Sequence, residues 1–407
     1  MSRKQQVQAI ILGSNPTALG VLRCLGRVRI PTIHVGLKIG LLSFSRWNQR
    51  DFPSLLPGPS QPGNLAAALE KLPIDKGVLF PCSDSLAMAV AISKEQLRDR
   101  FFSSSATSEV LRRLSDKSEL ADILDLCDIP HPKTVIVGHE HDNQELELQK
   151  MAGAFLKPVN SEGFVPRFGV KAFQVNSDED MISKVAEIHE AGYEVLLQEY
   201  VPGPACNHYF IDGFVNRFGK ICCLFARRRL RMYPPDFGNS SSMTSIAIED
   251  VAGAVDSLGV LFEKVRYRGI FSSEFKYDER DDLFKLIEIN VRPWLFVEFA
   301  AHCGVNVCKM AYDDALERDV SPIGDYKIGV KCVYAYYDIA SGWSLFKARQ
   351  LTAWAWLKSW WGAKFTFFCW DDPMPAIYNS FKWLGGFLKR RLPVNSLQRR
   401  NPHQLIS

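Results

Sequence analysis

The feature that most constrains the fold is a pair of neighbouring strands, each carrying a carboxylate in an apolar setting. Residues 273–276 contain Glu274, a charged turn follows at 278–282, and the second strand covers 284–294. On the second strand, polar side chains alternate with apolar ones: Glu288, Asn290 and Arg292 alternate with Ile287, Ile289 and Val291. Because side chains alternate across a strand, this pattern predicts that the three polar groups share one face.

That polar face predicts a binding site for a cation and an anion. A carboxylate, an amide and a guanidinium would be costly to bury without partners. Carboxylate and amide oxygens suit Mg²⁺, which proteins hold through a few carboxylates together with phosphate groups. A guanidinium beside them suits a carboxylate or a phosphoryl group. A half-exposed strand with a salt bridge between Glu288 and Arg292 stays open as the structural alternative.

The first part of the chain has the pattern of a βαβ unit. Residues 7–12 predict a buried strand, 18–25 a helix and 30–35 a second strand. The turn after the first strand is not G-x-G-x-x-G, so the dinucleotide fingerprint is absent. Another buried strand at 77–80 leads to Asp84, at the sheet edge where open α/β sheets place their ligands. We interpret Asp84 as a helix N-cap in preference to a ligand.

Two weaker motifs lie between these regions. Lys157 ends an apolar strand at 155–158, just before a loop at 160–170 that contains two glycines. A lysine can reach phosphates, and glycines let the backbone approach them. Residues 196–203 form an apolar strand that enters a Pro-Gly turn, which could act as a hinge whose backbone groups bind an adenine edge. Taken alone, each motif is equally compatible with a solvated lysine or a plain strand and turn.

The C-terminal region is basic and rich in tryptophan. Residues 341–407 hold ten Lys or Arg and two acidic residues, a net charge of +8, whereas the whole chain carries +4. The positive charge therefore lies in the tail, which argues against a general nucleic-acid binder with a basic stripe on its folded domains. Seven of the nine tryptophans are here: Trp343, Trp354, Trp356, Trp360, Trp361, Trp370 and Trp383.

Two interpretations of this tail stay open. Ile377, Phe381, Leu384 and Leu388 recur at helical spacing among basic residues, as in an interfacial helix that rests on anionic lipid. The alternative, which we favour, is a helical subdomain that packs its aromatic side chains on the main body.

The sequence shows no export signal and no apolar window long enough to span a bilayer. The ten cysteines include no C-x-x-C pair. We therefore expect a cytoplasmic protein with reduced thiols, with a peripheral location at the inner face of the membrane left open through residues 341–407.

Taken together and in this order, the motifs resemble the ATP-grasp superfamily over about residues 5–310. More closely, they resemble its carboxylate–amine ligase branch, which contains D-aspartate ligases and is similar to the large chain of carbamoyl-phosphate synthase. The residues that carry the resemblance are Asp116-Lys117, Leu156-Lys157-Pro158, Gln198-Glu199-Tyr200-Val201-Pro202-Gly203, Glu274, and Glu288-Ile289-Asn290-Val291-Arg292.

The resemblance implies a mixed α/β and α+β chain in three parts. Residues 1–114 are expected to form a Rossmann-like pre-ATP-grasp domain. Residues 115–325 are expected to form the ATP-grasp domain, with the nucleotide, metal and substrate site. Residues 326–407 are expected to form an aromatic, basic, helical extension.

The resemblance also implies roles for individual residues. Lys117 and Lys157 would contact the phosphates, and Gln198, Glu199, Tyr200 and Val201 would hold the adenine. Glu274, Glu288 and Asn290 would ligate one or two Mg²⁺ (or Mn²⁺) ions, and Arg292 would hold the substrate carboxylate. Either Arg229 or Arg231 would approach the substrate, and the catalytic residues we predict are Arg292, Lys157 and Arg231.

The chain departs from the superfamily pattern in two segments. The loop at 161–171 is not glycine-rich, which puts its grip on phosphates in doubt. Residues 204–207 lack the acidic residue that often binds the ribose, so either Asn207 takes that role or the ribose is bound differently.

The resemblance implies a two-step reaction with ATP and small-molecule substrates. A carboxylate attacks the γ-phosphate to give an acyl phosphate and ADP, and an amine then forms the amide and releases phosphate. A thiol or hydroxyl acceptor, or bicarbonate as the acid, stays open, as does a homodimer. No nucleic-acid partner is expected. The alternative of another class is a membrane-associated nucleotide-binding protein without catalysis.

Overall fold

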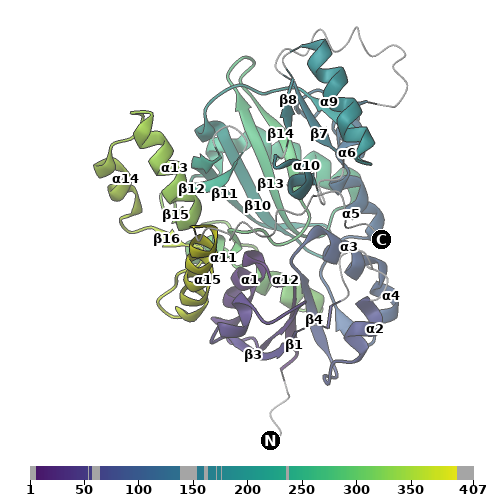
Figure 1. Ribbon diagram of the computed structural model, residues 1–407. Helices are drawn as coiled ribbons and strands as arrows, with labels where there is room; N and C mark the ends of the chain where they lie inside the picture. The colour runs from purple at the N-terminus through teal and green to yellow at the C-terminus, as the bar shows by residue number, and fades with distance from the viewer. Residues whose placement is uncertain are drawn as a thin grey trace, which may run out of the picture.

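The structure is a computed structural model, and it describes residues 6–53, 55–56, 65–137, 154–159, 164–170, 172–175, 177–234 and 238–391. Three β-sheets organise these residues (Figure 1). A parallel sheet lies at the N-terminal end of the molecule, a small antiparallel sheet lies at the opposite end, and a large sheet runs between them.

The N-terminal sheet has five parallel strands in the order β3-β2-β1-β4-β5. The strands are β1 (Gln8–Leu12), β2 (Thr32–Val35), β3 (Asn48–Phe52), β4 (Gly77–Pro81) and β5 (Phe101–Phe102). The helices that accompany them are α1 (Pro16–Gly26), α2 (Leu65–Glu70), α3 (Asp84–Ile92), α4 (Lys94–Leu97) and α5 (Ser108–Ser115). The predicted βαβ unit and the strand at 77–80 are confirmed.

Local chemistry explains the start of α1. Asn15 caps the helix by accepting a hydrogen bond from the backbone N–H of Ala18, and Pro16 occupies the first turn, where a missing N–H costs nothing. Gly13, with a φ of +110°, makes the turn out of β1. Side chains of the strands themselves, including Ile10, Ile33 and Leu79, contribute to an apolar core.

The small sheet has four strands in the order β6-β9-β7-β8, all paired antiparallel. The strands are β6 (Thr134–Val137), β7 (Phe155–Pro158), β8 (Phe173–Gln174) and β9 (Val195–Gln198), with helices α8 (Phe164–Phe168) and α9 (Asp178–Glu190). Helix α6 (Lys117–Leu126) leads into this sheet, capped by the carboxylate of Asp116. In the loop predicted at 161–171, residues 161–163 and 171 lie outside the described residues.

The large sheet has seven strands in the order β14-β13-β10-β11-β12-β15-β16. They are β10 (His208–Val215), β11 (Ile221–Tyr233), β12 (Asn239–Ser245), β13 (Gly269–Asp278), β14 (Leu283–Asn290), β15 (Lys331–Val333) and β16 (Lys364–Phe365). Short 3₁₀ turns lie at η1 (Leu41–Phe44), η3 (Ala205–Asn207) and η4 (Glu249–Val251). All neighbours pair antiparallel except β15 and β16.

One face of the large sheet is apolar. Ile211, Phe271 and Phe275 point toward helix α10 (Ala252–Val265) and form a buried core with it. Helices α11 (Val297–Cys303) and α12 (Val307–Ala315) join the sheet to the N-terminal part, since both pack against α1. The opposite face of the sheet is therefore the one that can carry polar groups.

The C-terminal region combines two short strands with three helices, α13 (Ala335–Lys347), α14 (Ala353–Trp360) and α15 (Met374–Arg391). Strands β15 and β16 extend the large sheet, although we predicted only helices here. Helix α13 packs on β11 and β12, and α15 packs on η1 in the N-terminal part (Figure 1). The side chains of Trp383, Leu384 and Leu388 lie outside the described residues. Among the helices described, none has the length and apolar character needed to cross a membrane.

Candidate active site

The polar face of the large sheet gathers charged side chains from four neighbouring strands. In the antiparallel register, Phe210 of β10 lies opposite both Arg227 of β11 and Glu274 of β13, and Glu274 lies opposite Glu288 of β14. Residues two positions apart on each strand share this face. It therefore also carries His208, Asp212, Arg229, Lys276 and Asn290.

Glu274 is the centre of this group. Its Oε1 lies 2.7 Å from Nδ1 of His208 and accepts a hydrogen bond from Nη2 of Arg229 at 2.9 Å. Burial opposes ionisation, but the Arg229 charge and the His208 hydrogen bond outweigh it and hold the pKa of Glu274 well below its usual range. Glu274 is therefore an anion at neutral pH, and both of these contacts use the same oxygen.

His208 donates to this anion as a neutral ring. Burial lowers the pKa of His208, against the opposing effect of Glu274. Since the ionised carboxylate has no proton to give, the ring must carry its hydrogen on Nδ1. Arg229 and His208 thus hold the Glu274 carboxylate in one orientation.

A chain of hydrogen bonds continues from Glu288 to the N-terminal part of the molecule. Asn290 donates through Nδ2 to Oε1 of Glu288 at 2.7 Å and accepts through Oδ1 from Arg292 at 3.0 Å. Arg292 binds Asp84 in a bidentate pair, with distances of 2.8 and 2.9 Å. The direct salt bridge between Glu288 and Arg292, which was the structural alternative from the sequence, is replaced by this relay through Asn290.

The role that we predicted for Asp84 was wrong. Ser83 caps helix α3 by accepting from the backbone N–H of Leu86, and Asp84 is the first residue of the helix. Asp84 is instead the partner that orients Arg292. Because Asp84 begins α3 and Arg292 follows β14, 208 residues later, local patterning could not reveal the pair.

The strict alternation predicted on β14 is interrupted. The register shifts between Glu274 and Phe275, where Phe275 pairs with Leu286 and Glu274 pairs with Glu288. Ile287 is the extra residue of a β-bulge, which commonly re-aims side chains beside active sites. Glu288 and Asn290 still share the polar face, as predicted, and Ile289 and Val291 are in the core.

Two lysines lie together beside the small sheet. Lys157 donates to Oε1 of Gln198 at 2.6 Å, and Lys117 donates to the carbonyl of Pro158 at 2.7 Å. Burial and the charge of Lys157 lower the pKa of Lys117 to about 8. Two cations held this close and partly desolvated favour an anionic ligand such as a polyphosphate.

The segment after β9 links the small sheet to the large one. Glu199 accepts a hydrogen bond from the backbone N–H of Lys133 and forms ion pairs with Arg280 and Lys285 of the β13–β14 hairpin. The ammonium of Lys276 lies 4.8 Å from the centre of the Tyr200 ring. The predicted hinge therefore lies between the lysine pair and the polar face of the large sheet.

Asn207 is buried and engaged with the same hairpin. Its Nδ2 donates to Oε1 of Glu279 at 2.8 Å. The same amide lies against Gly203, where a Cβ would come within 2.7 Å of Nδ2. Gly203 also has a φ of +113°, so this turn requires glycine for two reasons.

Arg231 is not brought to this group of residues. Its Nε and Nη2 each lie 2.8 Å from a carboxylate oxygen of Asp338 on α13, which is fully buried. Of the two arginines that we considered for the substrate, Arg229 is the one that contacts Glu274. The difference arises because two register shifts on β11 fall on either side of Arg231.

The oxygen atoms of this site suit a magnesium ion. Glu274 and Glu288 face each other on paired strands, and Asn290 lies on the same face two residues on. These are hard oxygen donors, the type of ligand that Mg²⁺ prefers.

A D-aspartate ligase from Enterococcus faecium (strain Aus0004) is 27% identical over 251 residues, which are 59% of this chain and 58% of the relative. The chain thus matches little more than half the length of that relative. No protein-family model matches the chain.

The fold has relatives among solved structures. L-amino acid ligase from Bacillus licheniformis superimposes with a TM-score of 0.59 at 13% identity, covering 79% of both chains. The biotin carboxylase domain of Hydrogenobacter thermophilus 2-oxoglutarate carboxylase, solved with MgADP and bicarbonate, gives 0.62 at 15% identity, covering 80% and 74%. N5-carboxyaminoimidazole synthetase from Staphylococcus aureus, complexed with ADP, gives 0.60 at 12% identity, covering 81% and 82%.

The chain has the ATP-grasp fold. The predicted resemblance to the carboxylate–amine ligases is confirmed, since the curated relative and the structural neighbours are of that kind. In this fold, Lys157 belongs to the small sheet and Lys117 begins helix α6, whereas the carboxylates belong to the large sheet.

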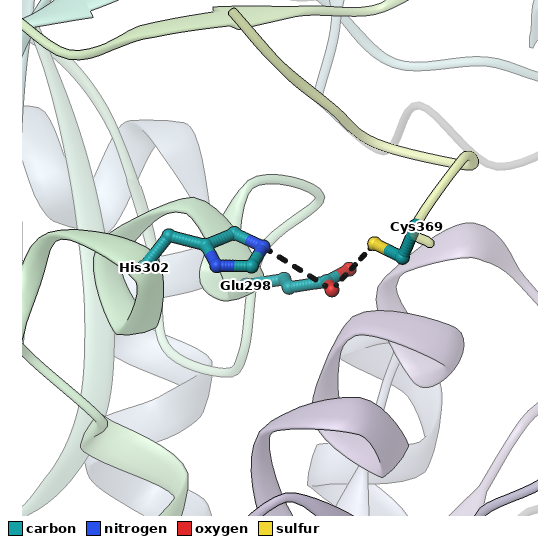
Figure 2. A group of neighbouring side chains, drawn as sticks. All are labelled: Glu298, His302 and Cys369. Carbon is teal, nitrogen blue, oxygen red and sulfur yellow. Dashed lines mark hydrogen bonds and ion pairs between the residues drawn. The ribbon is translucent and has the colours of Figure 1, made fainter. Parts of the chain in front are cut away.

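A second cluster of ligand-type side chains lies outside this site. Glu298, His302 and Cys369 bring ligand atoms within 4.8 Å of one another, with Glu298 between the other two (Figure 2). However, Glu298 also accepts from Arg27 at 2.7 Å and from Arg23 at 3.3 Å. Two guanidinium groups already balance this carboxylate, which disfavours a metal cation.

The protonation states of Glu298 and Cys369 also disfavour a metal cation at this second cluster. Burial opposes ionisation of Glu298, but His302 and the two arginines lower its pKa to about 2. Burial and the Glu298 charge raise the pKa of Cys369 to about 12, so it stays a thiol and lacks the thiolate form that binds metals. We assign this cluster a structural role in holding the C-terminal segment.

Two residues of the candidate site were not recognised as site residues from the sequence. His208 begins β10, and only the register of that strand places it beside Glu274. Asp84 was recognised at the end of β4 but was interpreted as a cap. The usable signal was its location at the carboxyl edge of a parallel sheet, where ligand-binding groups collect.

Proposed function

We propose that this chain is an ATP-dependent ligase that activates a carboxylate as an acyl phosphate and joins it to an amine. The observation that carries the proposal is the pairing of Glu274 with Glu288 on one sheet face, in line with Asn290 and Arg292. This face is joined by the hinge at Glu199 to the lysines of the small sheet.

Each side chain then has a part in the reaction. Lys117 and Lys157 would hold the phosphates of ATP, while Gln198, Glu199 and the backbone of Tyr200 and Val201 would hold the adenine. Glu274, Glu288 and Asn290 would hold Mg²⁺ (or Mn²⁺), which would neutralise charge on the transferred phosphoryl group. Positioning and charge neutralisation are the main requirements of phosphoryl transfer.

Arg292 would bind the substrate carboxylate. Its guanidinium is already oriented by Asp84, which raises its pKa against the effect of burial, so it stays charged. A guanidinium suits a carboxylate in the ground state and the acyl phosphate formed from it, and the substrate would compete with Asp84 for this group. Arg229 would add positive charge on the same face, in place of the predicted Arg231.

An amino-acid-type substrate fits the names of two similar proteins, the D-aspartate ligase and the L-amino acid ligase. The structural neighbour from Hydrogenobacter thermophilus was solved as a dimer with bicarbonate, and bicarbonate as the acid and a homodimer remain proposals for this chain. A nucleotide-binding protein without catalysis is less favoured, because every predicted metal ligand lies on the shared polar face.

Nucleotide turnover tests the proposal. The protein is incubated with Mg-ATP and pooled acids and amines, and ADP is separated from AMP. We expect ADP and phosphate only in the presence of certain pools. AMP and pyrophosphate would mean adenylation and would overturn the acyl-phosphate mechanism, and ADP with bicarbonate alone would replace the proposed acid.

A further inference from the structure

Helix α14 has two opposite apolar faces, and only one of them packs on the protein. Trp356, Ser359 and Trp360 turn inward, at helical spacing. On the other side of the helix, Trp354 is 76% exposed, Leu357 is 61% exposed and Trp361, just after the helix, is 89% exposed. A soluble helix normally exposes its polar side, so this outward row needs an explanation.

The inward face is anchored by a buried carboxylate. Asp338 of α13 accepts hydrogen bonds from Nε1 of Trp356 at 2.9 Å and from Nε1 of Trp360 at 2.7 Å, and it also pairs with Arg231. The Trp356 ring lies directly on Gly342 of α13, where a Cβ would come within 2.4 Å of the ring. Helix α14 is therefore held in one orientation, and its outward row is a fixed surface.

Helix α13 carries a second exposed apolar row. Ile339, Trp343 and Phe346 lie at helical spacing and are 50%, 54% and 44% exposed. The rings of Trp343 and Phe346 stack, and the ammonium of Lys347 lies 5.2 Å from the centre of the Trp343 ring. The two helices form a hairpin that projects from one side of the molecule (Figure 1).

The charges of this region are sorted by sign. Of the two acidic residues after position 341, Asp372 is fully buried and pairs with Arg23, and the half-exposed Asp371 pairs with Arg27. The exposed charged side chains of the hairpin and the strand that follows it are basic: Lys347, Arg349, Lys358 and Lys364. The outward surface therefore combines tryptophan, leucine and positive charge.

We propose that the α13–α14 hairpin is a docking surface for an anionic lipid bilayer. Tryptophan is the side chain most typical of the membrane–water interface, and basic residues beside it are attracted to anionic headgroups. A second copy of the chain fits less well, because a two-fold contact through this surface would bring its lysines against each other. The proposal does not depend on the proposed ligase activity.

Vesicle sedimentation tests the proposal with the full chain. Deleting the region would leave the fully buried Arg23 without Asp372, so point substitutions are the better probe. The test variant is Trp354→Ser/Leu357→Ser/Trp361→Ser, and a second variant is Lys358→Glu. The control is Leu126→Ser/Phe218→Ser, which removes two side chains that are 68% and 73% exposed elsewhere on the surface.

We expect the unaltered protein and the control to sediment with vesicles of phosphatidylcholine and phosphatidylglycerol. Binding to vesicles of phosphatidylcholine alone should be weaker by about tenfold or more, and added salt should weaken the anionic binding. The triple variant should lose binding while keeping its thermal midpoint. Lys358→Glu should bind less tightly than the unaltered protein.

Three outcomes would overturn the proposal. The first is equal sedimentation of the triple variant and the unaltered protein. The second is equal binding to neutral and anionic vesicles. The third is failure of the unaltered protein to bind vesicles while light scattering shows a dimer that the triple variant disrupts, because the surface would then be an interface between two copies.

Discussion

Two glutamates, the partly buried Glu274 and the buried Glu298, have similar surroundings and different roles. Each lies beside a histidine and at least one arginine, and the pKa of each is lowered by those neighbours against the effect of burial. At Glu274, His208 and Arg229 both contact Oε1. At Glu298, Arg27, His302 and Cys369 contact Oε1, and Arg23 contacts Oε2.

The difference shows how geometry separates a binding carboxylate from a structural one. Glu298 has partners at both oxygens and a side chain that is 6% exposed, so a ligand would have to displace an arginine. Glu274 is held through one oxygen, is 18% exposed and faces a second carboxylate across the strand pair. Composition of a cluster is therefore a weaker guide to metal binding than the distribution of its contacts.

The largest expected effect is on activity, and it distinguishes the carboxylates of the candidate site from Glu298. Glu288→Gln should lower the rate of ADP formation about a thousandfold, because a metal-binding carboxylate supplies several kcal/mol of transition-state stabilisation. Since Glu288 is exposed, the thermal midpoint should stay close to that of the unaltered protein. Glu263→Gln, at an exposed position of α10, is the control. Near-normal turnover by Glu288→Gln would remove the metal assignment.

The opposite pattern is expected at the second cluster. Arg23→Met should lower the free energy of unfolding by about 3–5 kcal/mol, because it leaves the buried Asp372 without its ion-pair partner and Glu298 with Arg27 alone of its two arginines. Denaturant titration measures this, with the exposed Arg50→Met as control. Turnover per folded molecule should change little. A loss of turnover in fully folded Arg23→Met would mean that this cluster belongs to the active site.

Arg229 and Arg231 of β11 allow the same comparison, between a residue of the candidate site and a structural residue, within one strand. Arg229→Lys should lower kcat/KM about a hundredfold with a small effect on stability, since its partner Glu274 is in the site. Arg231→Lys should instead lower the free energy of unfolding by about 2 kcal/mol, because lysine cannot reproduce the bidentate pair with Asp338. The opposite result would restore Arg231 as the substrate residue that we predicted.

The smallest effect concerns the lysine whose pKa is lowered. With a pKa of about 8, Lys117 is charged at neutral pH and loses its proton as the pH rises. ATP phosphates favour the charged form, so the affinity for ATP should fall about threefold to tenfold between pH 8 and pH 9. Calorimetric titration with Mg-ATP measures this. Lys117→Arg, which stays charged, should bind with little pH dependence, and an unchanged slope in that variant would argue against Lys117 as the titrating group.

The sequence by itself determined much of this protein. Alternation on the strand at 284–294 predicted the shared face of Glu288 and Asn290, and the apolar runs at 7–12, 77–80 and 155–158 predicted strands that the structure contains. These predictions succeeded because period-two alternation and short buried runs are local properties, set by steric and hydrophobic preferences of neighbouring residues. The order of motifs also predicted the ATP-grasp fold.

Only the tertiary structure decided which charged groups meet. The pairs Arg292–Asp84, Arg229–Glu274, Arg231–Asp338 and Arg23–Asp372 join residues from different strands, helices or sheets. A register shift of one residue changes the partner of every side chain on a strand, and the register depends on bulges that local patterns do not announce. Tertiary contacts also decided that Trp356 and Trp360 of α14 pack on Asp338. Trp354 and Leu357 of the same helix face outward.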